Sequence, residues 1–184
     1  MTIHDTHPFA DPDPDPVRRF RGRLGGAVTL WTAGSERSEG PTRSGLTVSS
    51  LVVALGEPSH VVGLLDPDAD LTETLRETGR AVVQVLAWSD RALGEAFAGL
   101  APAPGGPFRL ADFEDTPWGP RLVSAGTWAG VELVDEREIG WSAEVTCRVA
   151  HLEVADDPTS GALGHRRGRW LPLVHPGHPL GSDG

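Results

Sequence analysis

The chain has 184 residues, a formal net charge of −10 and 39% hydrophobic residues, which is the composition of one globular domain that can bury a core. An acidic protein repels a phosphate backbone, so the charge argues against a nucleic-acid-binding protein. No apolar run approaches the ~20 residues of a membrane-spanning helix. Because the first five residues also lack the features of a secretory signal, we expect a cytoplasmic protein with no membrane partner.

The two ends of the chain differ from the rest in composition. Residues 1–16 finish in alternating Asp and Pro, which cannot pack a core, and residues 175–184 are rich in Pro and Gly. We expect both ends to be poorly ordered, with one domain over residues 17–174.

The front half predicts four strands separated by turns, with one helix before the first strand and one after each of the third and fourth. The hydroxyl-rich stretch Gly45–Ser50 follows a polar loop at 34–44, which predicts a hairpin with a long connection. Asp70 is of a residue type preferred at a helix N-cap. In a later helix, one face carries the apolar residues Ala92, Leu93, Ala96 and Phe97. The expected strands are 27–33, 45–50, 60–66 and 80–87, and the expected helices are 17–24, 71–78 and one that begins after Ser89 or Asp90.

The back half predicts mostly strands. Residues 99–118 are rich in Pro and Gly and are expected to form a surface excursion. Strand patterns follow near 131–133, 145–154 and 170–174, and the apolar phase slips at His151, which predicts a bulge there. Six or seven mostly antiparallel strands with three helices fit a small closed or partly open barrel better than a doubly wound sheet.

Several single residues are expected to be structural. Cys147, the only cysteine, falls on an apolar strand face and is expected in the core rather than as a nucleophile. His151 is expected to be a hydrogen-bonded structural residue, and Trp31, Trp88 and Trp128 are expected in the core.

The stretch Gly45–Ser50 is the strongest candidate for a binding site. In a strand, Thr47 and Ser49 share one face and Val48 packs behind them. Where such a strand ends, hydroxyls and freed backbone N–H groups can converge on a phosphate. Local sequence alone favours the simpler alternative, an edge strand whose hydroxyls face water, because Thr-rich strands are common.

Other catalytic signatures are missing. The chain has no G-x-G-x-x-G after a strand, no P-loop lysine motif and no G-x-S-x-G elbow. No histidine pairs with Cys or Glu at a metal-ligand spacing, so no bound metal is expected.

The chain from Arg18 to about Trp170 resembles the flavin reductase-like family. The resemblance rests on the basic helix followed by Gly26–Thr32, on the hydroxyl motif Gly45–Ser50, and on Pro58 and Asp66 at the two ends of a strand. It continues through Asp70-Leu71-Thr72, Gly79, Val85-Leu86-Ala87 and Phe97-Ala98-Gly99, and its front half is specific as a set.

This resemblance implies a mainly β fold, an antiparallel, Greek-key-like split β-barrel with a few peripheral helices. It also implies that FMN, with FAD as the alternative, is reduced by NAD(P)H through hydride transfer, which needs stacked rings rather than a triad. Thr47 and Val48 would then lie along the ring and ribityl, with Ser49 and Ser50 near the phosphate. The full implied cofactor set is Arg43, Leu46, Thr47, Val48, Ser49, Ser50, Asp66, Asp70, Thr72 and Arg80, with Arg76 as a further candidate phosphate cation.

Three departures from the family pattern leave the function open. Gly140-Trp141-Ser142 stands where the family usually has Gly-Asp-His near the nicotinamide, so no catalytic residue is assigned. Gln84 replaces a usual Asn, and residues 51–55 replace a serine-rich continuation. The alternatives are therefore a reductase that supplies a monooxygenase, a non-catalytic flavin carrier or redox sensor, and a cofactor-free interaction domain. Family resemblance also implies a homodimer.

Overall fold

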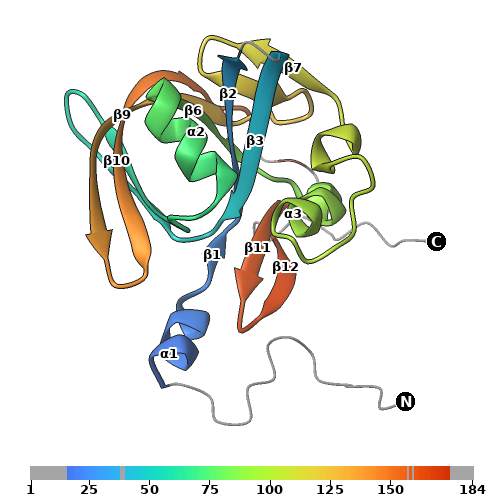
Figure 1. Cartoon of the computed structure of the whole chain (residues 1–184). Coiled ribbons are helices and arrows are strands. Elements are labelled where there is room, and N and C mark those ends of the chain that lie inside the picture. The colour runs from blue at the N-terminus through green and yellow to red at the C-terminus, as the bar shows by residue number, and fades with distance from the viewer. Residues whose placement is uncertain (1–15, 38–39, 157, 159, 175–184) are drawn as a thin grey trace, which may run out of the picture.

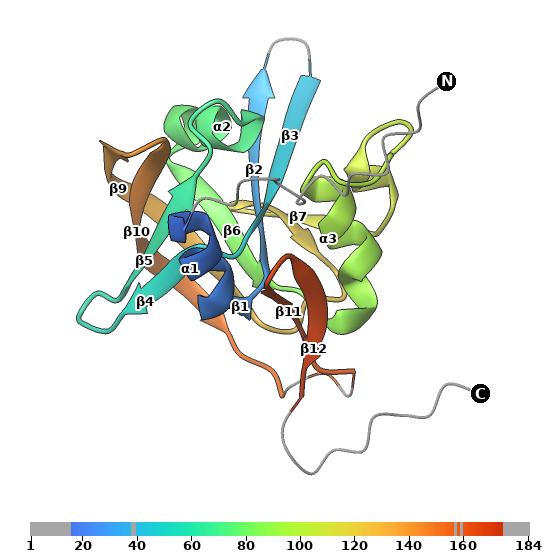
Figure 2. The same cartoon turned by 90° about the horizontal axis from the view of Figure 1, so that it is seen from below.

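The computed structural model describes residues 16–37, 40–156, 158 and 160–174 (Figures 1 and 2). The tail predicted at 175–184 lies outside these residues, as does the predicted arm apart from Pro16. The described helices are α1 (Pro16–Leu24), α2 (Asp70–Thr78), α3 (Arg91–Phe97) and the 3₁₀ turns η1 (Trp88–Asp90) and η2 (Pro107–Arg109). The described strands are β1 (Gly26–Ala27), β2 (Thr29–Arg37), β3 (Gly40–Val48), β4 (Leu51–Ala54), β5 (His60–Leu65), β6 (Arg80–Val85), β7 (Phe113–Thr116), β8 (Gly119–Leu122), β9 (Trp128–Ile139), β10 (Ser142–Glu153), β11 (Ala162–Arg166) and β12 (Arg169–Leu173).

Seven strands form one antiparallel sheet, in the order β3-β2-β6-β9-β10-β5-β4. β3 and β4 are its two edges, yet only Ser49 and Ser50 separate them along the chain. Because the step from Val48 to Leu51 spans at most about 10 Å, the sheet has to curl until the end of β3 lies close to the start of β4. Figure 1 shows the curled sheet. The predicted mainly β, split-barrel fold with a few peripheral helices is confirmed.

A smaller sheet, β1-β11-β12, lies against one end of the barrel. Its central strand β11 joins the large sheet through Leu163, whose N–H donates to Leu86 O at 2.7 Å and whose carbonyl accepts from Val28 N–H at 2.8 Å. The sequence predicted β12 but missed β11, because Gly164 interrupts its apolar pattern. The helix α1 packs beside this sheet (Figure 2).

The barrel interior is filled by the fully buried Trp31 and the aliphatic side chains around it. The ring of Trp31 reaches across to β5, where a Cβ at Gly63 would lie 3.1 Å from it. Cys147 is buried in the same cluster, and burial raises the pKa of its thiol to about 12. The predicted core roles of Trp31 and Cys147 are confirmed.

A second core lies between α3, the small sheet and the segment that follows α3. Phe97 meets Phe108 and Phe113 edge to face, with ring centroids 4.9 and 6.1 Å away. Phe108 and Phe113 belong to the stretch predicted as a surface excursion, so that prediction was wrong for its aromatic residues. Gly and Pro dominate its composition and hide the few rings that anchor it.

Three local predictions were also wrong. The loop expected at 34–44 is mostly strand, because β2 extends to Arg37 and β3 begins at Gly40 with nine paired positions between them. Asp70 is the first residue of α2 rather than its cap; Ala69 holds the cap position without a side-chain bond. Ala92 is exposed, and Gly94 takes the place expected for it on the buried face of α3.

The bulge predicted near His151 is confirmed, since the register between β9 and β10 shifts between Val149 and His151. The imidazole of His151 stacks on Trp118 with centroids 5.1 Å apart and lies 4.6 Å from the ring of Trp128. His151 is therefore structural, as predicted, and Trp128 is buried. Trp88 is half-buried and packs against the second core.

We predict that Gly45→Ala lowers the free energy of unfolding by about 1–3 kcal/mol, since overpacking a filled site costs that much. A Cβ at Gly45 would lie 2.5 Å from Cε1 of Phe97, so the ring and with it α3 would have to move. Urea denaturation monitored by tryptophan fluorescence measures the change. The matched control is Gly34→Ala on the neighbouring strand, where the nearest atoms lie at an ordinary 3.5 Å. Equal losses in the two variants would show that Gly45 does not seat α3.

Candidate functional site

Ser49 and Ser50 form the junction at which the two edges of the barrel meet, and we call this pair the hydroxyl junction. Ser49 is exposed and Ser50 half-buried. The Ser50 carbonyl accepts a hydrogen bond from Leu64 N–H at 2.9 Å, which fixes the junction to β5. The two serines are therefore held on a fixed backbone, with Ser49 the more exposed of the pair.

A buried relay fixes the strand that enters the junction. The indole N–H of Trp31 donates to Thr29 Oγ1 at 3.1 Å, and the Thr29 hydroxyl donates to the Val48 carbonyl at 2.7 Å. Val48 itself is 4% exposed. The backbone just before Ser49 is thus bonded on its inner side, as a preorganised binding site requires.

Arg21 brings a positive charge to the junction. Its Nη2 donates to Ser50 Oγ at 3.1 Å. Two contacts hold α1 in place for this: Arg167 N–H donates to Gly22 O at 2.8 Å, and Arg166 Nε donates to Arg23 O at 3.2 Å. Sequence reasoning missed Arg21 as a site residue, although it identified the basic helix that carries it.

The three arginines proposed as phosphate cations from sequence have other partners. Arg43 pairs with Asp115 at 2.7 Å, and Arg80 donates to the Pro117 carbonyl at 3.1 Å. Arg76 binds Glu136 through Nε and Nη2, the shortest distance being 2.6 Å. The contacts found for these arginines do not include the hydroxyl junction.

The remaining residues of the expected cofactor set lie around the junction with different exposure. Leu46 is half-buried and packs against the barrel core, as does the buried Val48. Thr47 donates its hydroxyl to Gly94 O at 2.7 Å, so it holds α3 against β3. These three side chains therefore support the strand, and the junction hydroxyls are the groups that remain accessible.

The loop between β5 and α2 is acidic and self-contained. Asp66 Oδ1 accepts the Asp68 N–H at 3.0 Å, and the fully buried Thr72 donates its hydroxyl to Asp66 O at 2.6 Å. Asp66, Asp68 and Asp70 are all exposed. The three carboxylates repel a phosphate, and the Thr72 hydroxyl already donates to Asp66 O, so this loop is unfavourable for phosphate binding.

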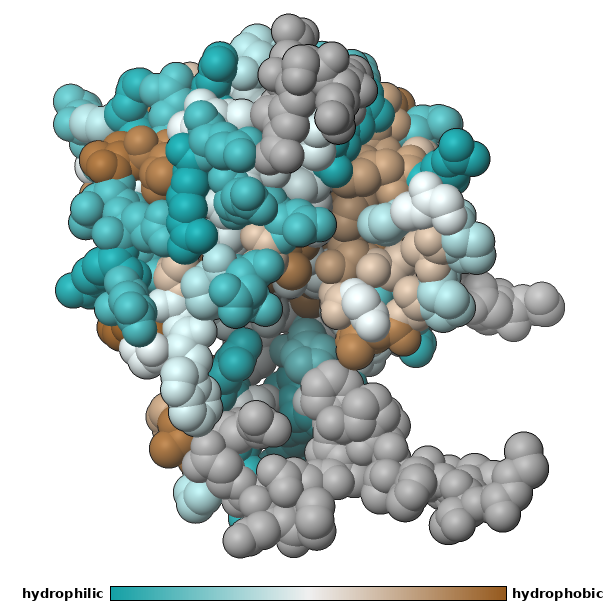
Figure 3. All heavy atoms as spheres, viewed as in Figure 1, coloured by the Kyte–Doolittle hydropathy of each residue, from teal (hydrophilic) through white to brown (hydrophobic). Residues whose placement is uncertain are grey.

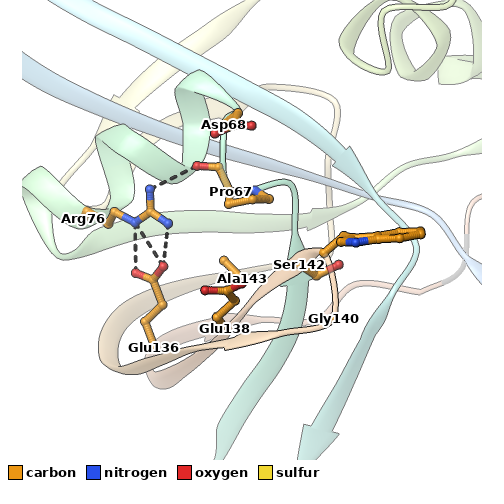
Figure 4. A pocket seen from close by; sticks show the side chains of 9 residues that line it. Pro67, Asp68, Arg76, Glu136, Glu138, Gly140, Ser142 and Ala143 are labelled. Atoms are coloured by element: carbon orange, nitrogen blue, oxygen red, sulfur yellow. Dashed lines mark hydrogen bonds and ion pairs between the residues drawn. The ribbon is translucent and has the colours of Figure 1, made fainter.

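A recess of about 470 Å³ lies beside this loop, between Arg76 and the turn of the β9–β10 hairpin. Figure 4 shows Arg76 bonded to both Glu136 and the Pro67 carbonyl along one side of it. Trp141, in the stretch Gly140-Trp141-Ser142 where the resemblance implies Gly-Asp-His, is 95% exposed at the hairpin turn. The recess also contains Asp68 and Glu138, so its charge is unfavourable to anions.

One imidazole does lie near Arg21. His165 on β11 pairs with Gly26 on β1 and meets the ring of Trp170 with centroids 5.2 Å apart. Burial, and after it the charge of Arg21, lowers the pKa of His165, so the ring is neutral at pH 7.

The hydroxyl junction fits one anionic group. It offers the Ser49 and Ser50 hydroxyls, and the guanidinium of Arg21 forms no ion pair with a described residue. Figure 3 shows the surface hollowed near the middle of the face that includes α1 and the β11–β12 hairpin. Oxygen-rich anions such as phosphate match this donor set.

Comparison with known proteins gives one family match. The family model described as "Flavin reductase like domain" matches residues 21–173. No curated protein sequence matches the chain.

Solved structures share the fold at low sequence identity. The styrene monooxygenase flavin reductase of Pseudomonas putida S12 superposes with a TM-score of 0.74 at 21% identity, over 88% of this chain and 99% of that one. The NADH:FAD oxidoreductase SgcE6 of Streptomyces globisporus C-1027, in complex with NAD and FAD fragments, superposes with a TM-score of 0.74 at 18% sequence identity. The match covers 88% of this chain and 93% of that one. BorF, the flavin reductase component of a bacterial two-component tryptophan halogenase, superposes with a TM-score of 0.74 at 20% sequence identity. The match covers 86% of this chain and 97% of that one.

We predict that Glu136→Gln destabilises the protein by roughly 0.5–1 kcal/mol at pH 7, the range for partly exposed bidentate pairs. The hydrogen bond from Arg76 holds the pKa of Glu136 below its ordinary value. A carboxyl group whose pKa is lower in the folded protein than in the unfolded chain stabilises the fold at pH values above its pKa in the unfolded chain. This stabilisation is lost as the pH falls through its pKa in the folded protein. The difference between the variant and the wild type should therefore vanish in acid. Urea denaturation at a series of pH values measures it.

The control for this prediction is Glu138→Gln, which changes the same charge in the same recess at a residue without an ion pair among the described residues. A pH-independent loss in Glu136→Gln, or an equal loss in the control, would contradict an ion-pair contribution.

Proposed function

Because the chain belongs to the flavin reductase-like family, we propose that it binds a flavin and transfers hydride to it from NADH or NADPH. FMN is the proposed flavin and FAD the alternative. The observation that carries the proposal is the hydroxyl junction, where the guanidinium of Arg21 donates to Ser50 next to the exposed Ser49, on a backbone bonded to β5.

In this proposal the residues of the chain bind and orient rather than carry out acid–base chemistry. A bound flavin supplies the hydride-accepting ring. Ser49, Ser50 and Arg21 hold the anionic tail, and Thr47 and Val48 keep the strand beneath it in position. His165, neutral and next to Arg21, is the nearest identified group able to hold or donate a proton beside the site.

The fold relatives support a partner enzyme. One is named as the flavin reductase of a styrene monooxygenase and another as the reductase component of a halogenase. We propose by analogy that this protein passes reduced flavin to a separate oxygen-dependent enzyme. Among the described residues, no helix is long and apolar enough to cross a membrane. Cytoplasmic location remains part of the proposal.

A homodimer is also part of the proposal, and exposed apolar side chains support it. Val52, Val53 and Leu55 on and after the edge strand β4 are 64%, 60% and 91% exposed. On α1, Val17 and Phe20 are 72% and 65% exposed. Apolar groups at this density on an edge strand and a neighbouring helix are typical of a surface that is covered by a partner.

A second candidate function is a flavin carrier or redox sensor without reductase activity. The observation that favours it is the stretch Gly140-Trp141-Ser142, because an exposed indole and a serine supply no titratable group where the family pattern has Gly-Asp-His. Activity measurements separate the two functions.

We predict that Arg21→Gln raises the dissociation constant of FMN about tenfold or more, since a hydrogen bond to a charged group is of the stronger class. Riboflavin, which has no phosphate, should bind the variant and the wild type equally. Quenching of flavin fluorescence measures both constants. Arg91→Gln serves as the charge-matched control, because Arg91 pairs with Glu95 on α3.

A second variant tests the same site by repulsion. Ser49→Asp with Ser50→Asp places two carboxylates at the junction and should abolish FMN binding. If this double variant retains FMN as tightly as the wild type, the phosphate does not bind at the hydroxyl junction.

We predict that Trp141→His increases the rate of NADH oxidation with FMN by about tenfold or more, a modest part of what a positioned acid or base contributes. Steady-state loss of NADH absorbance measures the rate. Trp141→Phe is the control, since it shortens the ring without adding an imidazole. Equal gains in the two variants would assign the effect to access rather than to proton transfer.

A further inference from the structure

The arginines of this chain are distributed very unevenly. All sixteen basic residues are arginines, and seven of them lie in residues 18–23 and 166–169. Residues 16–35 and 158–182 contain no Asp or Glu at all, although the chain has 26 acidic residues. In the fold, these two segments come together as α1, β1, β11 and β12.

The arginines elsewhere are mostly neutralised. Six form ion pairs with carboxylates: Arg43, Arg76, Arg91, Arg121, Arg137 and Arg148. Arg19, Arg21, Arg23, Arg166, Arg167 and Arg169, which we call the arginine module, form no ion pair with any described residue. Arg19 and Arg23 also stand four residues apart on α1, a like-charge spacing that weakens a helix.

Arg167 is in an unfavourable backbone conformation. Its φ is 54° and that of Gly168 is 73°, so the two residues form the tight turn between β11 and β12. Asn, Asp and Gly suit such a turn, whereas Arg does not. Arg167 is the one non-glycine residue of the described chain with a positive φ. An unfavourable conformation that keeps a charge at a hairpin tip points to a use for that charge.

The arginine module is continuous with the hydroxyl junction. Arg21 bonds Ser50, and the stem of Arg166 lies against Gly25 while its Nε bonds Arg23 O. Gly26, next along the chain, faces the Ser49 carbonyl and pairs with His165. A ligand at the junction therefore has the arginine module beside it.

We propose, on the basis of the function proposed above, that the arginine module, together with the hydroxyl junction beside it, binds the diphosphate of a dinucleotide. One phosphate needs only Arg21 and the two hydroxyls, whereas a diphosphate uses the further guanidinium groups of Arg166 and Arg167. The acidic loop at Asp66–Asp70 disfavours the same group on the other side of the junction.

The length of the anion is also limited. Outside the seven clustered arginines the rest of the chain is strongly acidic, since the whole has a net charge of −10. A long polyanion would run from the arginine module onto repelling surface, while a diphosphate stays within it. The diphosphate can belong to FAD or to the nicotinamide dinucleotide, because the module would recognise either.

The test uses the full-length protein and three forms of it: wild type, Arg166→Gln with Arg167→Asn, and the control Arg91→Gln with Arg109→Gln. The control removes the same charge from exposed arginines outside the module. Dissociation constants are measured for FMN and FAD by flavin fluorescence, and for NADH and ADP by calorimetry without added flavin, so that NADH is not oxidised during the titration. Asn suits the turn better than Arg, so the melting temperature of the module variant should be unchanged or higher.

We expect the module variant to bind ADP about tenfold more weakly than the control does, since charge-assisted bonds to phosphate are lost. FMN binding should change less than about threefold, because Arg21 and the hydroxyls remain. If the module variant also binds FAD more weakly than the control does, the diphosphate belongs to the flavin. If it binds NADH more weakly instead, the diphosphate belongs to the nicotinamide dinucleotide. Either result supports the proposal.

Equal binding of ADP, FAD and NADH by the module variant and the control would overturn the proposal while leaving FMN binding intact. Failure of the wild type to bind FMN would instead refute the proposed function. A third variant, Asp11→Asn with Asp13→Asn and Asp15→Asn, tests whether the acidic arm of the chain occupies the module. Tighter ADP binding by this variant, with no loss of FAD or NADH in the module variant, would assign the arginines to the arm and overturn the proposal.

Discussion

The two-residue connection between β3 and β4 is the constraint on which the rest of the fold depends. These strands are the opposite edges of a seven-stranded sheet, so Ser49 and Ser50 can join them only if the sheet closes on itself. Closure surrounds Trp31 with the barrel core and places two hydroxyls at the one point where the edges meet. Fold and candidate site therefore have the same cause, and a change that loosens the junction should affect both.

Those parts of the site that are local in sequence were predictable, and those that depend on distant contacts were not. The Gly45–Ser50 motif identified the junction because strand alternation and the end of the strand are local properties. Arg21 was missed since it reaches Ser50 across 29 positions in sequence, a contact that no periodicity encodes. Arg43 is close in sequence to the Gly45–Ser50 motif, and Arg76 is close to the loop at Asp66–Asp70. Each pairs instead with a carboxylate that is distant in sequence, Asp115 on β7 and Glu136 on β9 respectively. The barrel was predictable from the strand count and the family pattern, whereas the extent of the β2–β3 hairpin was not, because its polar residues resemble a loop.

Trp141 lies in the β9–β10 hairpin turn and belongs to neither of the two hydrophobic cores. The turn places Trp141 in solvent, and Gly140, with a φ of 58°, makes the turn without reference to the neighbouring side chain. Nothing in the barrel core depends on an imidazole at this position. The hydroxyl junction, which is the proposed flavin-phosphate site, and the turn at Gly140-Trp141-Ser142, where the resemblance implies a nicotinamide contact, are therefore separate parts of the chain.

Local pairing, rather than net charge, decides where an anion can bind to this protein. Six arginines bound to carboxylates are largely neutralised within a few ångströms, so they add little to the potential beyond about a Debye length of 8–10 Å. The arginine module has no carboxylate in its own strands and helix, and its arginines form no ion pair with a described residue. In a protein with a net charge of −10, the described residues thus include a cluster of arginines without ion pairs to other described residues, and this cluster borders the hydroxyl junction. Had the same arginines been spread evenly among the acidic residues, the junction would lie in a negative field. The hydroxyls of two serines alone would then not offset the repulsion of a phosphate.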